Sequence, residues 1–147
     1  MPAQSTTLNF TTDINTTGTT TILTTTSVLS MPAYYRNNST SNPPYNKLTF
    51  PSNREKGCGY YGISSGLHTV TYTVSHNYVG TVTMQATLAT APIDADWFDV
   101  KDTKQAYTYN AQNTTSTTAV TFVGNFTWVR ANVDLSQGTM LAIQYNF

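Results

Sequence analysis

The sequence is 147 residues long, has a formal net charge of zero, and carries charged side chains at only 10% of its positions. A chain of this length suits one domain, and because a neutral surface has no field to hold phosphate groups, we expect neither nucleic-acid binding nor attachment to an anionic membrane. Thr, Asn and Ser replace the missing charges. Thr favours strands while Asn and Ser favour turns, so the composition predicts a β protein.

Residues 1–30 are rich in Thr, with Asp13 as their only ionisable side chain. Two interpretations remain open for this segment. Short apolar groups favour edge strands near Leu8–Phe10 and Ile22–Ser30. Alternatively, the first part is an extended arm that becomes ordered against another subunit, and Leu8 and Phe10 then belong to an interface.

Residues 31–66 contain four prolines and two pairs of neighbouring tyrosines. Proline at this density is incompatible with interior strands, so we expect a long irregular contact loop with one short strand near Lys47–Phe50. Long loops in compact domains are usually functional, and tyrosine presents apolar area with a polar tip. The candidate interface consists of Tyr34, Tyr35, Tyr60 and Tyr61. The alternative is that these rings cover an open end of the domain.

Residues 67–147 form the body of the domain, where six or seven short runs alternate with turns and no helical period is present. The runs His68–Ser75 and Thr81–Leu88 alternate apolar with polar side chains, and we expect them to pair with each other. Phe126–Val133 and Thr139–Phe147 alternate in the same way around a polar turn, which predicts a hairpin at the end of the chain. The pattern predicts an all-β fold, an antiparallel two-sheet β-sandwich of the jelly-roll or Ig-like type.

The sequence shows no arrangement of histidines or acids that indicates chemistry. His68 and His76 have no partner at zinc-ligand spacing and are interpreted as structural or surface residues. Four acids, Asp94, Asp96, Asp99 and Asp102, could offer oxygens to calcium, but they lack the pattern of a calcium loop and are better explained as turn caps.

The two remaining candidates for a catalytic residue, Glu55 and Cys58, lack the neighbours that catalysis requires. Glu55 is the only glutamate, which leaves no carboxylate pair for glycoside hydrolysis. Cys58, the single cysteine, can form no internal disulfide and has no strong activating neighbour for nucleophilic attack. We therefore expect no catalytic residues, no cofactor and no metal. No signal-peptide pattern begins the chain and no apolar run approaches a membrane span, so we expect a mature protein that begins near Met1 and is made in the cytoplasm.

Two stretches of the sequence share a pattern with a known group of proteins. They read GTVTMQATLATAPIDADWFDV (Gly80–Val100) and FVGNFTWVRANVDLSQGTMLAIQYNF (Phe122–Phe147). In this pattern a G-x-V/L-x-x-Q-A-T-L strand leads to a D-W-F element, and a closing G-N-F-x-W-x-R strand precedes the final strand. The chain resembles small virion structural proteins of tailed bacteriophages, in particular of cyanophages and other marine phages. The resemblance implies a core filled by Trp97, Phe98, Phe126 and Trp128, to which the alternating runs add Val82, Leu88 and Ile143.

The resemblance implies a building block of the phage particle, made in the host cytoplasm and located in the virion. The preferred hypothesis is a capsid decoration, or cement, protein that binds the outer capsid surface as a homotrimer and stabilises the shell through contacts with the major capsid protein or other virion proteins. The alternative is a baseplate, neck or tail-fibre component whose tyrosine loop stacks on the sugar rings of a host glycan. A free enzyme or carbohydrate-active domain is a third hypothesis, which lacks an acid–base pair.

Overall fold

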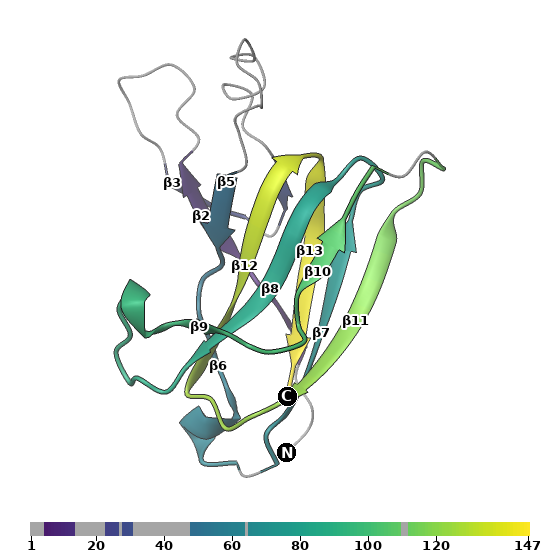
Figure 1. The fold of residues 1–147 in the computed structure, drawn as a ribbon. Helices are drawn as coiled ribbons and strands as arrows, with labels where there is room; N and C mark the ends of the chain where they lie inside the picture. The colour runs from purple at the N-terminus through teal and green to yellow at the C-terminus, as the bar shows by residue number, and fades with distance from the viewer. Residues whose placement is uncertain (1–4, 14–22, 27, 31–47, 64, 110–111) are drawn as a thin grey trace.

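The computed structural model of the chain describes residues 5–13, 23–26, 28–30, 48–63, 65–109 and 112–147 (Figure 1). Within these residues the regular elements are β-strands and two short 3-10 helices. They are β1 (Ser5–Thr7), β2 (Phe10–Asp13), β3 (Leu23–Thr26), β4 (Leu29–Ser30), β5 (Leu48–Pro51), β6 (Glu55–Lys56), η1 (Cys58–Tyr61), β7 (Leu67–Val74), β8 (Val79–Thr87), η2 (Asp94–Asp96), β9 (Phe98–Asp99), β10 (Gln105–Tyr107), β11 (Ser116–Val123), β12 (Trp128–Gln137) and β13 (Thr139–Asn146). None of the helices described is long and apolar enough to cross a membrane.

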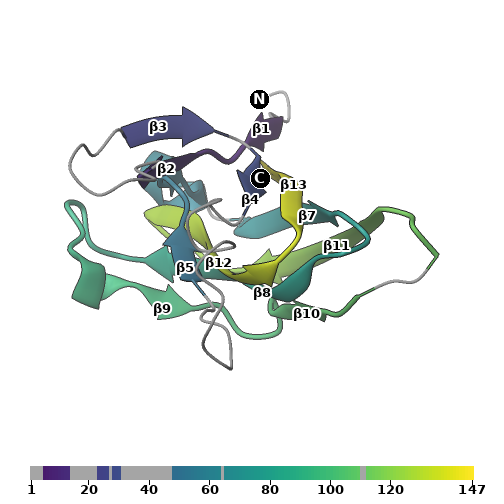
Figure 2. The same cartoon turned by 90° about the horizontal axis from the view of Figure 1, so that it is seen from above.

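Two antiparallel sheets lie face to face (Figures 1 and 2). The five-stranded sheet has the order β1-β13-β7-β11, with β4 beside β13. The six-stranded sheet has the order β10-β8-β12-β5, with β6 beside β12 and β9 beside β8. A separate pair, β2 and β3, lies at one side of the sandwich in Figure 2. The predicted all-β, two-sheet antiparallel sandwich is confirmed.

The core fills the space between the two sheets, and period-two alternation explains which side chains enter it. On β7 and β8 the residues that alternate toward the inside are buried, as the sequence predicts. Val82 and Ile143, both fully buried, are confirmed as core residues. The largest buried side chains include Tyr72, Tyr78, Tyr145, Phe10, Leu8, Met84, Leu135, Met140 and Ile143.

The predicted strand pairs are wrong, because consecutive strands cross from one sheet to the other. β12 pairs with β8 in the six-stranded sheet, whereas β13 pairs with β7 in the five-stranded sheet. The expected hairpin is therefore a crossover at Gly138, whose φ of 83° lies in the left-handed region that glycine favours. A Cβ atom on Gly138 would lie 2.4 Å from Cα of Tyr78 in the link between β7 and β8, so the two crossovers pack closely together.

Several predicted core residues lie outside the core. Leu88 is 65% exposed because β8 ends at Thr87, whose side-chain oxygen accepts a hydrogen bond from the Ala89 N–H and turns the chain away. Phe98 is 44% exposed because it belongs to a two-residue edge strand, although its ring still meets the partly buried Phe126. Phe126 itself packs against the core.

The resemblance also predicts both tryptophans, Trp97 and Trp128, in the core, but both are only half-buried. Val129, Ala131 and Val133 occupy the inner face of β12, so the alternation places Trp128 on the outer face. Trp97 follows η2 and lies against Arg130, a second outer-face residue of β12. The large ring of a tryptophan is therefore an unreliable sign of the core in this chain.

The described part of residues 1–30 forms strands instead of a free arm. β1 pairs with the last strand, β13, and the Leu8 N–H donates to the Ile143 carbonyl oxygen at 2.8 Å. Leu8 and Phe10 are fully buried in the core of their own chain, so the prediction that they form an interface is wrong. In the contact loop, the expected short strand is present as β5.

Candidate functional site

A turn of 3-10 helix fixes two tyrosines at one end of the sandwich. The Gly57 N–H, just before η1, donates to the Thr127 carbonyl oxygen at 3.0 Å. A Cβ atom on Gly57 would come within 2.4 Å of the Phe126 carbonyl oxygen, so this close approach requires glycine. Tyr60 and Tyr61 are 45% and 46% exposed. They are therefore presented to solvent from backbone that is bonded to the segment before β12.

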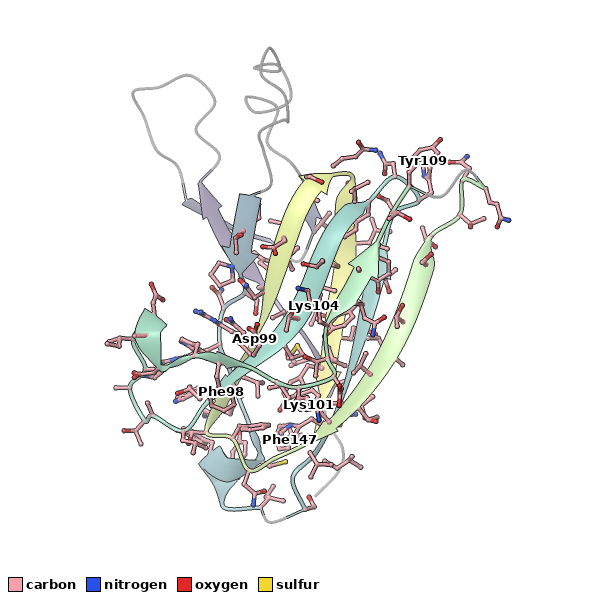
Figure 3. All side chains as sticks on the ribbon, in the orientation of Figure 1. Phe98, Asp99, Lys101, Lys104, Tyr109 and Phe147 are labelled. Atoms are coloured by element: carbon pink, nitrogen blue, oxygen red, sulfur yellow. The ribbon has the colours of Figure 1, made fainter. Side chains whose placement is uncertain are left out.

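Four rings at this end form a continuous series, which we call the aromatic band: Trp128, Tyr60, Tyr61 and Phe147. Ring centroids are 5.0 Å apart between Trp128 and Tyr60, and 5.3 Å apart between Tyr60 and Tyr61. Tyr61 then stacks on Phe147 at 5.6 Å with an interplanar angle of 17°. These separations are typical of favourable aromatic pairs. Figure 3 shows Phe147 at the same end of the sandwich as Phe98, and Tyr109 at the opposite end.

Cationic side chains cover part of the aromatic surface on the side of the six-stranded sheet. The guanidinium carbon of Arg54 lies 4.3 Å from the centroid of Trp128, and Nζ of Lys56 lies 4.6 Å from the centroid of Tyr60. Arg130 lies over Trp97 at the same distance, 4.3 Å. All three distances fall within the range of cation–π attraction. On this side the rings therefore have partners within the chain.

Hydrogen bonds link the polar residues of the same face. Arg130 Nε donates to Gln85 Oε1 at 2.8 Å, and Gln85 Nε2 donates to Asp99 Oδ1 at 2.9 Å. A longer ion pair of 3.8 Å joins Arg130 to Asp94, whose side chain is fully exposed, so water screens most of this attraction. On the outer face of the six-stranded sheet, these polar side chains therefore bind each other.

The outer face of the five-stranded sheet contains a hollow of about 450 Å³. The hollow is lined by Ser5, Leu67, Thr69, Thr71, Gln144, Tyr145, Asn146 and Phe147. None of these eight described residues has a side chain that is charged at neutral pH. The lining offers hydroxyl and amide groups together with two apolar side chains, one of which, Leu67, is 54% exposed.

Strand register brings these side chains together. Gln144 on β13 lies opposite Thr71 on β7, and Asn146 lies opposite Thr69. Ser5 on β1 lies opposite Asn146 from the other side. Residues directly opposite in an antiparallel sheet point to the same face, so three strands contribute one group of polar side chains. Because Phe147 belongs both to the hollow and to the aromatic band, the band ends at the rim of the hollow.

A buried histidine supports the floor of the hollow from the inside. His68 Nε2 lies 2.8 Å from the Gly124 carbonyl oxygen, which can only accept, so this nitrogen carries the proton. Nδ1 then accepts from the Tyr145 hydroxyl at 2.8 Å. Burial lowers the pKa of His68, with the Gly124 contact acting in the opposite direction. Both ring nitrogens are bonded within the chain, which confirms the interpretation of His68 as a structural residue.

The other titratable candidates show no catalytic arrangement in the described part of the chain. Cys58 is only 1% exposed, and burial raises the pKa of its thiol, which disfavours the nucleophilic thiolate. Burial also raises the pKa of Glu55, while Lys56 lowers it. Asp96 accepts a hydrogen bond from the Ile93 N–H at 2.8 Å, as expected of a turn cap. No three described His, Cys, Asp or Glu residues gather in a way that could hold a metal ion.

The sequence predicted only part of this surface. Tyr60 and Tyr61 are exposed as expected, whereas Tyr34 and Tyr35 lie outside the described residues. The hollow was missed, although a signal exists: polar residues alternate along both β7 and β13. That signal identifies a site only when β7 and β13 are known to be neighbours, whereas the alternation favours pairing β7 with β8 and β12 with β13.

Comparisons with known proteins find similarity at the level of structure. No family model matches the sequence, and no curated protein matches it. Among solved structures, the enzymatically active domain of tailspike protein 4 of bacteriophage CBA120 is 11% identical with a TM-score of 0.47, and the match covers 98% of this chain but only 18% of that one. A family 29 carbohydrate-binding module from Piromyces equi is 11% identical with a TM-score of 0.43, covering 99% and 91% of the two chains. A carbohydrate-binding module from Cellvibrio mixtus lichenase 5A, solved with cellotriose, is 18% identical with a TM-score of 0.36, covering 99% and 86%.

Proposed function

We propose that the chain is a non-catalytic structural protein of a phage particle, part of the tail, neck or baseplate, that binds an uncharged saccharide of the host in the hollow of its five-stranded sheet. The observation that carries the proposal is the lining of this hollow, which combines amide, hydroxyl and aromatic side chains with no charged group. Its volume of about 450 Å³ falls within the roughly 300–1,000 Å³ of small-molecule sites.

The chemistry of the lining suits a sugar. A saccharide carries hydroxyl groups that both donate and accept hydrogen bonds, and the amides of Gln144 and Asn146 and the hydroxyls of Thr69 and Thr71 do the same. The C–H face of a sugar ring is apolar and matches the ring of Phe147. An anionic sugar would have no opposite charge in this lining, so a neutral ligand is favoured.

The link to a phage particle depends on the sequence resemblance of Gly80–Val100 and Phe122–Phe147. These stretches contain β8, η2, β9, β12 and β13, and they supply Gln85, Arg130 and the polar residues of β13. The resemblance therefore concerns both the scaffold and one wall of the hollow.

The direct test is an NMR titration of the isotopically labelled chain with a panel of neutral oligosaccharides, and with an acidic oligosaccharide as comparison. We expect a neutral ligand to shift signals of β7 and β13, and a Gln144→Ala/Asn146→Ala variant to weaken binding at least about tenfold, which corresponds to 1.4 kcal/mol. Thr117→Ala, on the outer face of the same sheet but outside the lining, should bind as the unaltered chain does. Failure of every neutral saccharide to shift β7 and β13, or binding that survives the double change, would refute the proposal.

A second candidate function is capsid decoration, which one observation favours. Leu88, Ile93 and Phe98, all in the segment that leads from β8 to β9, are 65%, 67% and 44% exposed. Exposed apolar side chains gathered in one segment suit a protein contact. Quantitative mass spectrometry of purified particles distinguishes the two candidates, since hundreds of copies per particle favour decoration and tens or fewer favour a tail part.

A further inference from the structure

The edges of the two sheets differ in length. Of the strands that end the two sheet orders, β1 has three residues, β10 has three, and β5 has four and ends in Pro51. β11, the fourth edge, has eight residues. Proteins usually keep exposed edge strands short or interrupt them with proline, because free backbone groups on a long edge pair with other chains. Among the edge strands of the described residues β11 is the exception, and Figure 1 shows it at the outside of its sheet.

The register identifies which backbone groups face outward on β11. The Gly124 N–H donates to the Gly66 carbonyl oxygen at 2.9 Å, and this pair continues the register of β11 with β7. In an antiparallel ladder such hydrogen-bonded pairs alternate, so every second residue back from Gly124 is bonded to β7. The residues between them direct their N–H and C=O groups to the free edge. These are Thr117, Ala119, Thr121 and Val123.

β11 lacks the features that protect an edge. Ser116–Val123 contains no charged residue and no proline, and its pairing with β7 has no bulge over eight residues. Val123 is 71% exposed. An uninterrupted, uncharged and regular edge of this length is a template for another strand.

We propose that β11 pairs antiparallel with β11 of a second copy of this chain, which joins two five-stranded sheets into one continuous sheet. A two-fold axis perpendicular to the sheet brings the outward-facing backbone groups of both copies together. With the axis at Ala119, for example, Thr117 of one copy lies opposite Thr121 of the other. Because β11 is uncharged, the pairing of identical strands sets no like charges against each other, which favours a second copy as the occupant.

One consequence depends on the proposed function. A two-fold axis perpendicular to the sheet keeps the outer faces of both copies on the same side, so the two hollows would face the same surface. Two saccharide sites on one side would bind a glycan-covered surface with higher avidity than either alone. Oligomeric state and saccharide binding are measured separately, so failure of one proposal can be distinguished from failure of the other.

The test is the mass of the full chain by sedimentation velocity over a concentration series. We expect a species of twice 16.1 kDa. Ala119→Pro removes an N–H that faces the free edge and leaves the hydrogen bonds to β7 intact. We expect this change to raise the dissociation constant of the dimer at least about tenfold. Ala119→Val keeps the N–H and should remain a dimer.

Circular dichroism melting shows whether the proline variant is folded. If the proline variant is not folded, the double variant Thr117→Lys/Thr121→Lys tests the dimer instead. Lysines on an edge strand oppose strand addition, and the lysine at position 117 of one copy would face the lysine at position 121 of the other. A monomer at all concentrations, a trimer, or a dimer that persists in the folded proline variant and in the lysine variant would overturn the proposal.

Discussion

The outer faces of the two sheets differ in how their polar groups are used. On the six-stranded sheet, Arg130, Gln85 and Asp99 bind each other, and Arg54 and Lys56 cover aromatic rings. On the five-stranded sheet, uncharged hydroxyl and amide groups surround a hollow. The aromatic and charged residues of the six-stranded sheet therefore have a structural role, because they bind each other. The Thr, Asn and Gln side chains of the five-stranded sheet line the better candidate for a ligand site.

The largest expected effect is a difference in stability between variants of two neighbouring residues of β13, Ile143 and Gln144. Ile143→Ala removes a fully buried side chain beneath the hollow and should lower the free energy of unfolding by about 2–5 kcal/mol. Gln144→Ala, on the outer face, should change it by less than about 0.5 kcal/mol. Urea denaturation of both variants measures the difference. A large loss of stability in Gln144→Ala would mean that this side chain has a structural role and would weaken its assignment to a binding site.

A second contrast compares the two outer faces directly. Arg130→Ala removes the bond to Gln85 and the contact with Trp97, and we expect it to lower the free energy of unfolding by about 1–3 kcal/mol without changing saccharide binding. Thr71→Ala in the hollow should do the reverse, with little change in stability and weaker binding. Arg130→Lys is the matched control, because it keeps the charge and loses the planar contact. Equal effects of Arg130→Ala and Thr71→Ala on binding would remove the distinction between the faces.

A smaller effect is expected when the pH is lowered. Burial holds the pKa of His68 below its ordinary value, so above pH about 6.5 the histidine is neutral in both the folded and the unfolded chain. As the pH falls below this value, the unfolded chain takes up the proton first and the free energy of unfolding decreases until the folded-state pKa is reached. Thermal melts between neutral and mildly acidic pH should show this loss, and His68→Gln should show less of it. Glu55→Gln is the control for the nearby carboxyl group, whose pKa is raised.

Sequence periodicity predicted the faces of the strands well and their partners poorly. His68 and Val70 on β7, and Val82 and Met84 on β8, point inward as the alternation indicates. The same alternation is compatible with pairing inside one sheet and with facing across a sandwich, because it specifies a face and not a neighbour. The crossover at Gly138 therefore could not be distinguished from a hairpin turn.

Local irregularities account for most of the remaining errors. On β13 a register shift between Met140 and Ala142 places Met140 in the core, whereas strict alternation back from Ile143 would place Leu141 there. A bulge of one residue leaves no clear sign in a single sequence. The candidate site could not be predicted, because it depends on β1, β7 and β13 lying side by side. β1 and β13 are far apart in the sequence, and no local pattern shows that Ser5 pairs with Asn146.

The smallest effect tests whether Trp128 is a surface residue, as the alternation of β12 requires. Its Nε1–H donates to the Thr90 carbonyl oxygen at 3.1 Å, and its ring contacts Tyr60 and Arg54. Trp128→Phe keeps an aromatic ring at this position and loses the hydrogen bond to Thr90, so the free energy of unfolding should fall by about 0.5–1.5 kcal/mol in urea denaturation. If Trp128 were in the core, the free energy of unfolding would fall by more, because the smaller ring would leave a cavity that the surrounding side chains cannot fill. A loss well above this range would therefore place Trp128 among the core residues and reduce the contrast between the inner and outer faces of the six-stranded sheet.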